Sequence, residues 1–238
     1  MMVINNFLKS LFRKLRIYLI HVISGTVRPL SLRKSVLIIA PHPDDEALGC
    51  GGLIRRMVEQ GREVHVVVLT GGEKSLAEVD DEELRQVRRK MAQQASGILG
   101  GGITFLSYPD GKVRVDDPET VKLQDMIRMI QPEAIFIPHR GEGWNDHVVV
   151  RSILQQLDCG DAVLYEYCVW MWYYNVWSLD WKNAYLLSMN DTEYKAKRDA
   201  MKVYLETMAP CGKPYSGVLP PVLVWAHRWK KELYFRIK

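Results

Sequence analysis

The sequence predicts a single α/β domain of the Rossmann-like type, with a mostly parallel sheet and helices on both of its faces. Short apolar runs, such as residues 36–39 and 134–137, alternate along the chain with longer segments of helical periodicity. Strands that alternate with helices in this way form parallel sheets. The 238 residues, 47% of them hydrophobic, are enough for one sizeable core, and no linker-like stretch divides them.

The individual elements follow from apolar periodicity and from helix-stop signals. Strands are expected at 35–40, 63–69, 103–107, 133–138 and 162–167, with helices between them at 46–60, 79–99, 118–130 and 147–157. Tryptophan and tyrosine then crowd residues 170–181 with little period, which suits a core, a membrane interface, or a pocket wall or lid that stacks on sugar rings. The chain ends with a strand at 184–189, a helix at 192–208 capped by Asp191, and a strand at 232–237. Right-handed crossovers would bring the ends of the first and fourth strands together.

The turn after the first strand, Pro-His-Pro-Asp-Asp-Glu at 41–46, concentrates an imidazole and three carboxylates. Open α/β sheets bind their ligands at this end of their strands. Neighbouring acids in a tight turn repel one another, and a cation relieves that repulsion. The turn therefore predicts a metal site.

A second polar segment, residues 138–147, follows the apolar run at 134–137. If the two strand ends converge, His42, Asp45 and His147 supply three ligands and leave a position for water, the usual form of a catalytic zinc site. The cysteines Cys50, Cys159, Cys168 and Cys211 lack the spacing of a thiolate zinc site or of a disulfide framework. A reducing, cytoplasmic location is the default expectation.

These motifs resemble the PIG-L/LmbE family of zinc-dependent N-acetyl sugar deacetylases. The resemblance covers residues 35–210 and rests on the 41–46 motif, the glycine-rich helix start after it, and the later Asp-His pair at 146–147. Weaker matches are Leu-Thr-Gly-Gly-Glu at 69–73, Arg85, and Tyr-Pro-Asp-Gly at 108–111. The resemblance implies that His42, Asp45 and His147 bind Zn²⁺. It also implies that Asp44 is the general base, and that Arg85 and Asp110 lie near the sugar.

The chain departs from the family pattern at two positions. Trp144 stands three residues before His147, where the family usually has a histidine that is thought to stabilise the oxyanion, and Arg88 stands where the family often has Glu. His139 is the candidate to replace the missing histidine. Asp146, which loses its expected partner, stays a candidate catalytic residue, and Trp144 is a candidate sugar contact.

The predicted reaction is zinc-dependent removal of the N-acetyl group from an N-acetylhexosamine of the GlcNAc type. The sugar would belong to a glycoconjugate or be linked to a lipid or a nucleotide. Asp44 would act as the general base on the attacking water. Two alternatives stay open: a metal-dependent amidase that cleaves a non-sugar amide, and a non-catalytic zinc-containing protein that binds glycans.

The formal net charge of +4 conceals a segregation of charge along the chain. Residues 1–43 hold seven Lys or Arg and no acid, residues 213–238 hold six Lys or Arg and one acid, and the remainder holds 19 basic and 27 acidic residues. The acidic body and the lack of a recognised binding motif argue against nucleic acid as a partner.

Residues 1–30 are expected to form a basic amphipathic helix ahead of a deacetylase-like domain at 31–238. An apolar stripe lies at helical spacing, with Lys9, Arg13 and Arg16 on the other side; its members are Ile4, Leu8, Leu11, Leu15, Tyr18, Leu19 and Val22. Such a helix suits peripheral contact with a membrane surface that carries anionic lipids. The alternative is a helix packed on the domain with a solvated basic face. The uninterrupted apolar run at 17–20 is too short to span a bilayer.

Overall fold

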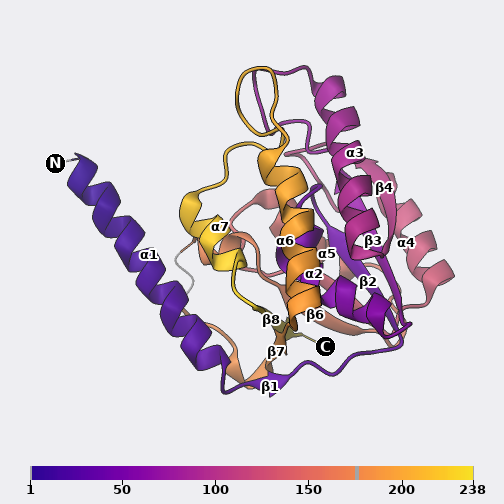
Figure 1. Cartoon of the computed structure of the whole chain (residues 1–238). Coiled ribbons are helices and arrows are strands. Elements are labelled where there is room, and N and C mark those ends of the chain that lie inside the picture. The colour runs from indigo at the N-terminus through magenta and orange to yellow at the C-terminus, as the bar shows by residue number, and fades with distance from the viewer. Residues whose placement is uncertain (1, 175–176, 238) are drawn as a thin grey trace.

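The predicted α/β fold is confirmed by the computed structural model, which describes residues 2–174 and 177–237 (Figure 1). Its sheet has eight strands in the order β1-β7-β8-β6-β5-β2-β3-β4. Only β8 runs antiparallel to its neighbours, β6 and β7. The strands are β1 (Arg28–Pro29), β2 (Ser35–Ala40), β3 (Glu63–Thr70), β4 (Gly102–Tyr108), β5 (Ala134–Pro138), β6 (Val163–Tyr167), β7 (Ala184–Ser188) and β8 (Lys231–Arg236).

The helices are α1 (Met2–Ser24), α2 (Asp45–Glu59), α3 (Asp81–Leu99), α4 (Glu119–Ile130), α5 (Asn145–Leu154), α6 (Asp191–Glu206) and α7 (Pro221–His227), with short 3₁₀ turns η1 (Trp170–Trp172) and η2 (Trp181–Asn183). The central strand β2 is buried along its whole length, and its residues alternate between two cores. Val36 and Ile38 pack with α2, α3 and α6, whereas Leu37 and Ile39 pack with α4 and α5. Helices therefore cover both faces, as a parallel sheet requires.

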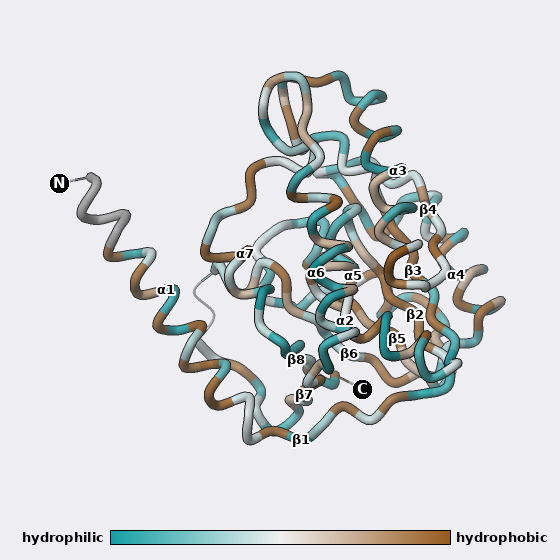
Figure 2. Tube along the Cα trace, viewed as in Figure 1, coloured by the Kyte–Doolittle hydropathy of each residue, from teal (hydrophilic) through white to brown (hydrophobic). Residues whose placement is uncertain are grey.

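Helix α1 packs on the domain by one side and leaves the other side exposed. Ile17 and Ile20 are buried in a third cluster with residues of β7, β8 and α7. The exposed side carries the predicted apolar stripe from Leu8 to Val22; the side chain of Ile4 lies outside the described residues. The packed-helix alternative is right about the packing but wrong about the solvated face, because the apolar stripe is turned outward. Hydrophobic and hydrophilic residues alternate along α1 (Figure 2).

Several boundaries differ from those expected. The two residues of β1 pair with β7, so the sheet already includes residues that precede the expected domain start at 31. Helix α5 begins at Asn145, which places Asp146 and His147 in its first turn. The N-cap of α6 is Asn190 and not Asp191, because the Asn190 side chain accepts the Glu193 amide while the Glu193 carboxylate accepts the Asn190 amide. Helix α7 was not predicted, since its seven residues follow Pro220 without a periodic pattern.

Among the described residues, no helix is both long enough and apolar enough to cross a bilayer.

A buried ion pair, Lys197–Glu232, packs against the middle of α2. The Lys197 ammonium from α6 donates to the Leu48 carbonyl, at 2.8 Å, and to Glu232, at 2.6 Å. The Glu232 carboxylate accepts the backbone amides of Gly52 and Leu53, at 2.8 and 2.9 Å. A regular helix would pair the amide of residue 52 with the carbonyl of residue 48. The ion pair contacts both of these groups and ties α2 to α6 and β8.

Glycines let α2 lie this close to its neighbours. A Cβ on Gly49 would lie 2.3 Å from the Tyr167 ring of β6, and a Cβ on Gly51 would lie 2.9 Å from the Lys197 side chain. Tyr167 cannot retreat easily, because its hydroxyl donates to the Ile39 carbonyl at 2.9 Å and the ring is fully buried.

We expect Gly49→Ala to lower the free energy of unfolding by about 1–3 kcal/mol, because the new methyl group overlaps the Tyr167 ring. Gly97→Ala in α3 is the matched control, since a Cβ there meets nothing within 4 Å. The control should raise stability by roughly 0.5–1 kcal/mol through helix propensity. Urea unfolding of both variants measures the difference, and equal shifts of the two midpoints would contradict the packing argument.

Candidate metal centre

The turn between β2 and α2 adopts a strained conformation. Asp44 has φ 132° and ψ −29°, a region that side-chain-bearing residues rarely adopt. Its amide donates to Glu46 at 3.1 Å, and its carbonyl accepts the amides that start α2. The Tyr204 hydroxyl of α6 donates to the other oxygen of Glu46 at 2.6 Å. Glu46 thus fixes the turn from inside the protein and does not line the cavity.

Three ligand atoms converge at the end of the turn. His42 Nδ1 lies 3.2 Å from His147 Nε2 and 3.4 Å from Asp45 Oδ2, and the last two atoms are 3.3 Å apart. Ligands at tetrahedral angles around zinc, with bonds of about 2.0–2.2 Å, lie roughly 3.3–3.5 Å from one another. The three residues therefore fit a zinc ion. His42 and Asp45 lie between the end of β2 and the start of α2, and His147 lies in α5, which follows β5. The pairing of β2 with β5 brings them together.

The second nitrogen of His42 faces two further carboxylates. His42 Nε2 lies 3.0 Å from Asp110 and 3.3 Å from Asp146. Asp146 also accepts the amides of Gly111 and Val113, at 2.6 and 3.1 Å, and Asp110 accepts that of Lys74 at 2.7 Å. Carboxylates on the distal nitrogen of a metal-binding histidine fix its orientation. Asp110 and Asp146 do this for His42, so Nδ1 is left for the ion.

Electrostatics at His42 favour a cation. Burial by itself lowers the pKa of the imidazole, but hydrogen bonds with Asp110, Asp146 and Asp45 raise it well above its ordinary value. For Asp45, burial acts to raise the pKa of the carboxyl. The charges of His147 and His42, with hydrogen bonds from His42, outweigh burial, so the pKa of Asp45 is lowered. A site that stabilises a proton so strongly between carboxylates is also suited to a divalent ion.

Glu142 stands behind the second histidine, and sequence reasoning missed it. Its carboxylate is fully buried and lies 3.4 Å from His147 Nδ1, an atom with no hydrogen-bond partner among the described residues. The same carboxylate accepts the amides of Val169, Trp170 and Met171 at the start of η1. Glu142 therefore links the histidine to the aromatic segment around η1. No local pattern reveals this, because the partners lie 27 to 29 residues away.

Asp44, the predicted general base, is held by Arg88. The buried guanidinium donates to Asp44 Oδ2 at 3.1 Å and to the carbonyls of Pro43 and Gly72, at 2.5 and 2.9 Å. Burial raises the pKa of Asp44 to about 8, although Arg88 acts in the opposite direction. Arg88, which stands where the family often has Glu, thus holds the predicted base and joins the turn between β2 and α2 to the loop after β3.

A cavity of about 280 Å³ opens beside these groups. Trp144 is half exposed at its edge and packs edge-to-face against Trp170, with ring centroids 5.6 Å apart. The cavity is lined by the predicted residues His42, Asp44, Asp45, Asp110, Trp144, Asp146 and His147, by Trp170 of the aromatic stretch, and by residues that were not predicted: Leu48, Lys74, Ser75, Arg88, Gly111, Asn145, Ser216 and Leu219. The aromatic stretch that starts at residue 170 therefore supplies part of a pocket wall.

Two predicted site residues do not line the cavity. His139 is buried against the Phe235 ring, and its Nδ1 accepts the Gly141 amide at 3.0 Å. Burial, with Arg140 and Arg151 nearby, lowers its pKa to about 4. Arg85 is about half exposed and pairs with Glu73 and Glu82. His139 thus does not fill the place of the missing family histidine, and Arg85 reaches the site only through Glu73, which accepts the Asp110 amide.

The fold and the site define an α/β protein with a candidate three-ligand metal site at the carboxyl end of a mostly parallel sheet. The chain belongs to the PIG-L family, whose sequence model, described as GlcNAc-PI de-N-acetylase, matches residues 37–157.

Relatives include both deacetylases and a hydratase. A 4-oxalmesaconate hydratase of Pseudomonas putida is 30% identical over 132 residues, 52% of this chain and 51% of the relative. A diacetylchitobiose deacetylase of Thermococcus kodakarensis is 31% identical over 50% of this chain and 47% of the relative. The chain thus spans about half the length of these relatives. The solved N,N'-diacetylchitobiose deacetylase of Pyrococcus horikoshii shares the fold, with a TM-score of 0.58 and 24% identity over 75% of this chain and 72% of that one.

We expect the wild-type chain to retain one zinc ion per chain after dialysis and His147→Ala to lose it, because two ligands hold the ion less tightly than three. His65→Ala is the control: this histidine lies on β3 and bonds Thr104, away from the centre. Elemental analysis measures the metal content. Full zinc occupancy in the His147 variant would contradict the assigned ligand set.

We expect Glu142→Gln to weaken zinc affinity about 10–100-fold, because the amide no longer offers a carboxylate to His147 Nδ1. Glu166→Gln removes another buried carboxylate, one that pairs with Arg151 and does not face a metal ligand. Competition with a chromophoric chelator gives both affinities, and thermal unfolding reports the general cost of each substitution. Equal zinc affinity in the two variants would remove Glu142 from the centre.

Proposed function

We propose that this protein is a zinc-dependent deacetylase that removes the N-acetyl group from an N-acetylhexosamine of the GlcNAc type. The single observation that carries the proposal is the juxtaposition of three fitting metal ligands with an additional carboxylate, Asp44, in one cavity. Membership in the PIG-L family and the deacetylases among the relatives support the same reaction. The four cysteines are free, which supports action in the cytoplasm.

The chain's own residues divide the work of amide hydrolysis. His42, Asp45 and His147 would hold the ion, which when bound polarises the amide carbonyl and lowers the pKa of water in the cavity. Asp44 is adjacent in sequence to a ligand but is turned toward Arg88 and the cavity. It would take the proton of the attacking water and deliver it to the departing amine nitrogen. Asp110 and Asp146 keep His42 in the orientation that this geometry needs.

The cavity suits a sugar ring. Trp144 and Trp170 offer aromatic surface of the kind that stacks on pyranose rings, while Asp110 and Lys74 border the same space with polar groups. We infer a lipid- or nucleotide-linked sugar in a glycoconjugate, because the basic residues at both ends of the chain complement a phosphate or an anionic surface.

A second candidate is a metal-dependent hydratase. It is favoured by the hydratase among the relatives. An amidase that acts on a non-sugar substrate and a non-catalytic glycan-binding protein are also compatible with the metal site. These four functions give different results when one panel of substrates is assayed.

We expect Asp44→Asn to retain zinc and to lose at least about 100-fold in the rate of amine release, because the amide cannot accept the proton. Asp116→Asn is the control, since this carboxylate is exposed and pairs only with Arg114 among the described residues. The assay follows primary amine release from N-acetylated sugars, with metal content measured on the same samples.

The wild-type results separate the four functions. Amine release from non-sugar amides alone would indicate an amidase, and turnover of an unsaturated acid without amine release would indicate a hydratase. Zinc and sugar binding without any turnover would indicate the binding protein. Full activity of the Asp44 variant would refute Asp44 as the base.

A further inference from the structure

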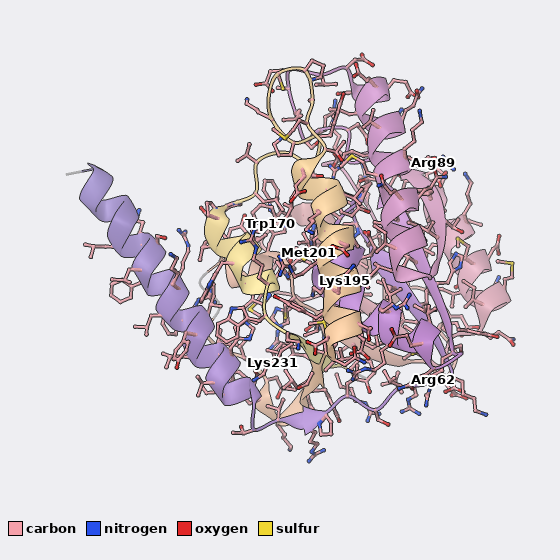
Figure 3. All side chains as sticks on the ribbon, in the orientation of Figure 1. Arg62, Arg89, Trp170, Lys195, Met201 and Lys231 are labelled. Carbon is pink, nitrogen blue, oxygen red and sulfur yellow. The ribbon has the colours of Figure 1, made fainter. Side chains whose placement is uncertain are left out.

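The outward side of α1 is an apolar surface that nothing in the described chain covers. The helix lies at the margin of the molecule, and its N-terminal half extends beyond the domain (Figures 1 and 3). Large side chains between 44% and 65% exposed follow one another along it: Leu8, Leu11, Phe12, Leu15, Tyr18, Leu19, Val22 and Ile23. We call these eight residues the α1 face.

The α1 face forms a single stripe with basic flanks. At about 100° per residue its members span roughly 140° of the helix circumference. The exposed Lys9 and Lys14 fall on opposite borders of this arc. An apolar stripe with a lysine on each border is the pattern of a helix that lies in the plane of a membrane interface.

The opposite side of α1 is fastened, so the helix cannot turn its apolar face inward. Arg13 donates to the Tyr173 carbonyl at 2.9 Å and stacks over that ring. The buried Arg16 donates to the carbonyls of Trp172 and Met171, at 2.6 and 3.2 Å. His21 lies stacked between Trp172 and Trp229, with ring centroids 4.9 and 3.8 Å away. Turning the helix would break all of these contacts.

We propose that the α1 face docks on an anionic lipid bilayer. The charge pattern favours lipid over a second copy of the chain. Paired helices place oppositely charged residues beside their apolar seam. Residues 1–43 contain seven Lys or Arg and no acid, so two such helices would set lysine against lysine. Anionic headgroups complement the same lysines on both borders.

The docked helix is joined to the candidate active site. Arg13 and Arg16 hold the carbonyls of residues 171–173, and Glu142 holds the amides of residues 169–171. Trp170, between these two anchors, lines the cavity, and Glu142 lies behind His147. The bilayer would therefore adjoin the wall of the cavity. Resting on the proposed deacetylase function, this identifies the substrate class as an N-acetyl sugar carried by a membrane lipid.

Vesicle co-sedimentation of the full chain tests the docking. We expect the wild type to bind vesicles of phosphatidylglycerol and phosphatidylcholine, and to bind pure phosphatidylcholine or high-salt samples more weakly. Leu11→Ser/Leu15→Ser should lower the partition coefficient about tenfold or more, because both exposed leucines lose their apolar contact. The matched control is Val121→Ser/Met129→Ser, which removes two exposed apolar side chains from α4 and should bind as the wild type does.

Further arms decide between occupants and between proposals. A wild type that binds neither kind of vesicle overturns the docking. So does a dimer in solution that Leu11→Ser/Leu15→Ser dissociates without any vesicle binding, because a second copy then covers the face. If the wild type docks, amine release from a lipid-anchored N-acetyl sugar in vesicles should be about tenfold slower in Leu11→Ser/Leu15→Ser than in the wild type. Release from the soluble analogue of this sugar should be the same in both. Equal rates on the lipid-anchored sugar overturn the substrate class, and no release from any sugar by the wild type refutes the deacetylase function alone.

Discussion

The burial of many carboxylates at one end of the sheet is the constraint on which the rest of this structure depends. The buried acids around the turn after β2 are Asp44, Asp45, Glu46, Asp110, Glu142 and Asp146. A buried charge is costly unless it is paired. Arg88 pairs with Asp44, backbone amides serve Glu142, and burial raises the pKa of Glu46 to about 7, despite the Tyr204 hydroxyl. Asp45 faces the imidazoles of His42 and His147, and an ion bound at that point would complete the charge balance.

The scaffold around α2 is built to hold this arrangement. Asp44 keeps an unfavourable φ only because Glu46 and Arg88 fix both sides of the turn. The helix that follows is tied by the Lys197–Glu232 pair at its middle, and its glycines allow direct contact with β6 and α6. Removing one partner of such a pair leaves an uncompensated buried charge. The site is therefore precise because the helix that starts at it cannot shift.

The sequence predicts the strand and helix order and the three ligands because both depend on local signals. Apolar runs mark the strands, and parallel pairing of β2 with β5 brings His42 and His147 together. What it could not predict depends on distant partners. His139 is polar and follows a strand like the ligands do, yet Phe235 from the far end of the chain covers it. Glu142 lies in the loop before α5, and its role depends on the amides of η1, which bond to its carboxylate. The orientation of α1 depends on Arg13 and Arg16, which donate to carbonyls about 155 to 160 residues away.

The replacement at Trp144 changes how the chemistry is shared. A histidine at that position would bring a further titratable group to the cavity, but tryptophan offers only an aromatic surface and an N–H donor. Trp144 packs on Trp170, so the exchange extends the wall that η1 provides. In the proposed reaction, proton transfer rests on Asp44, whose orientation is held by Arg88, the other departure from the family pattern. The two departures would thus act together: one extends the aromatic wall, and the other fixes the carboxylate that is proposed to move the proton.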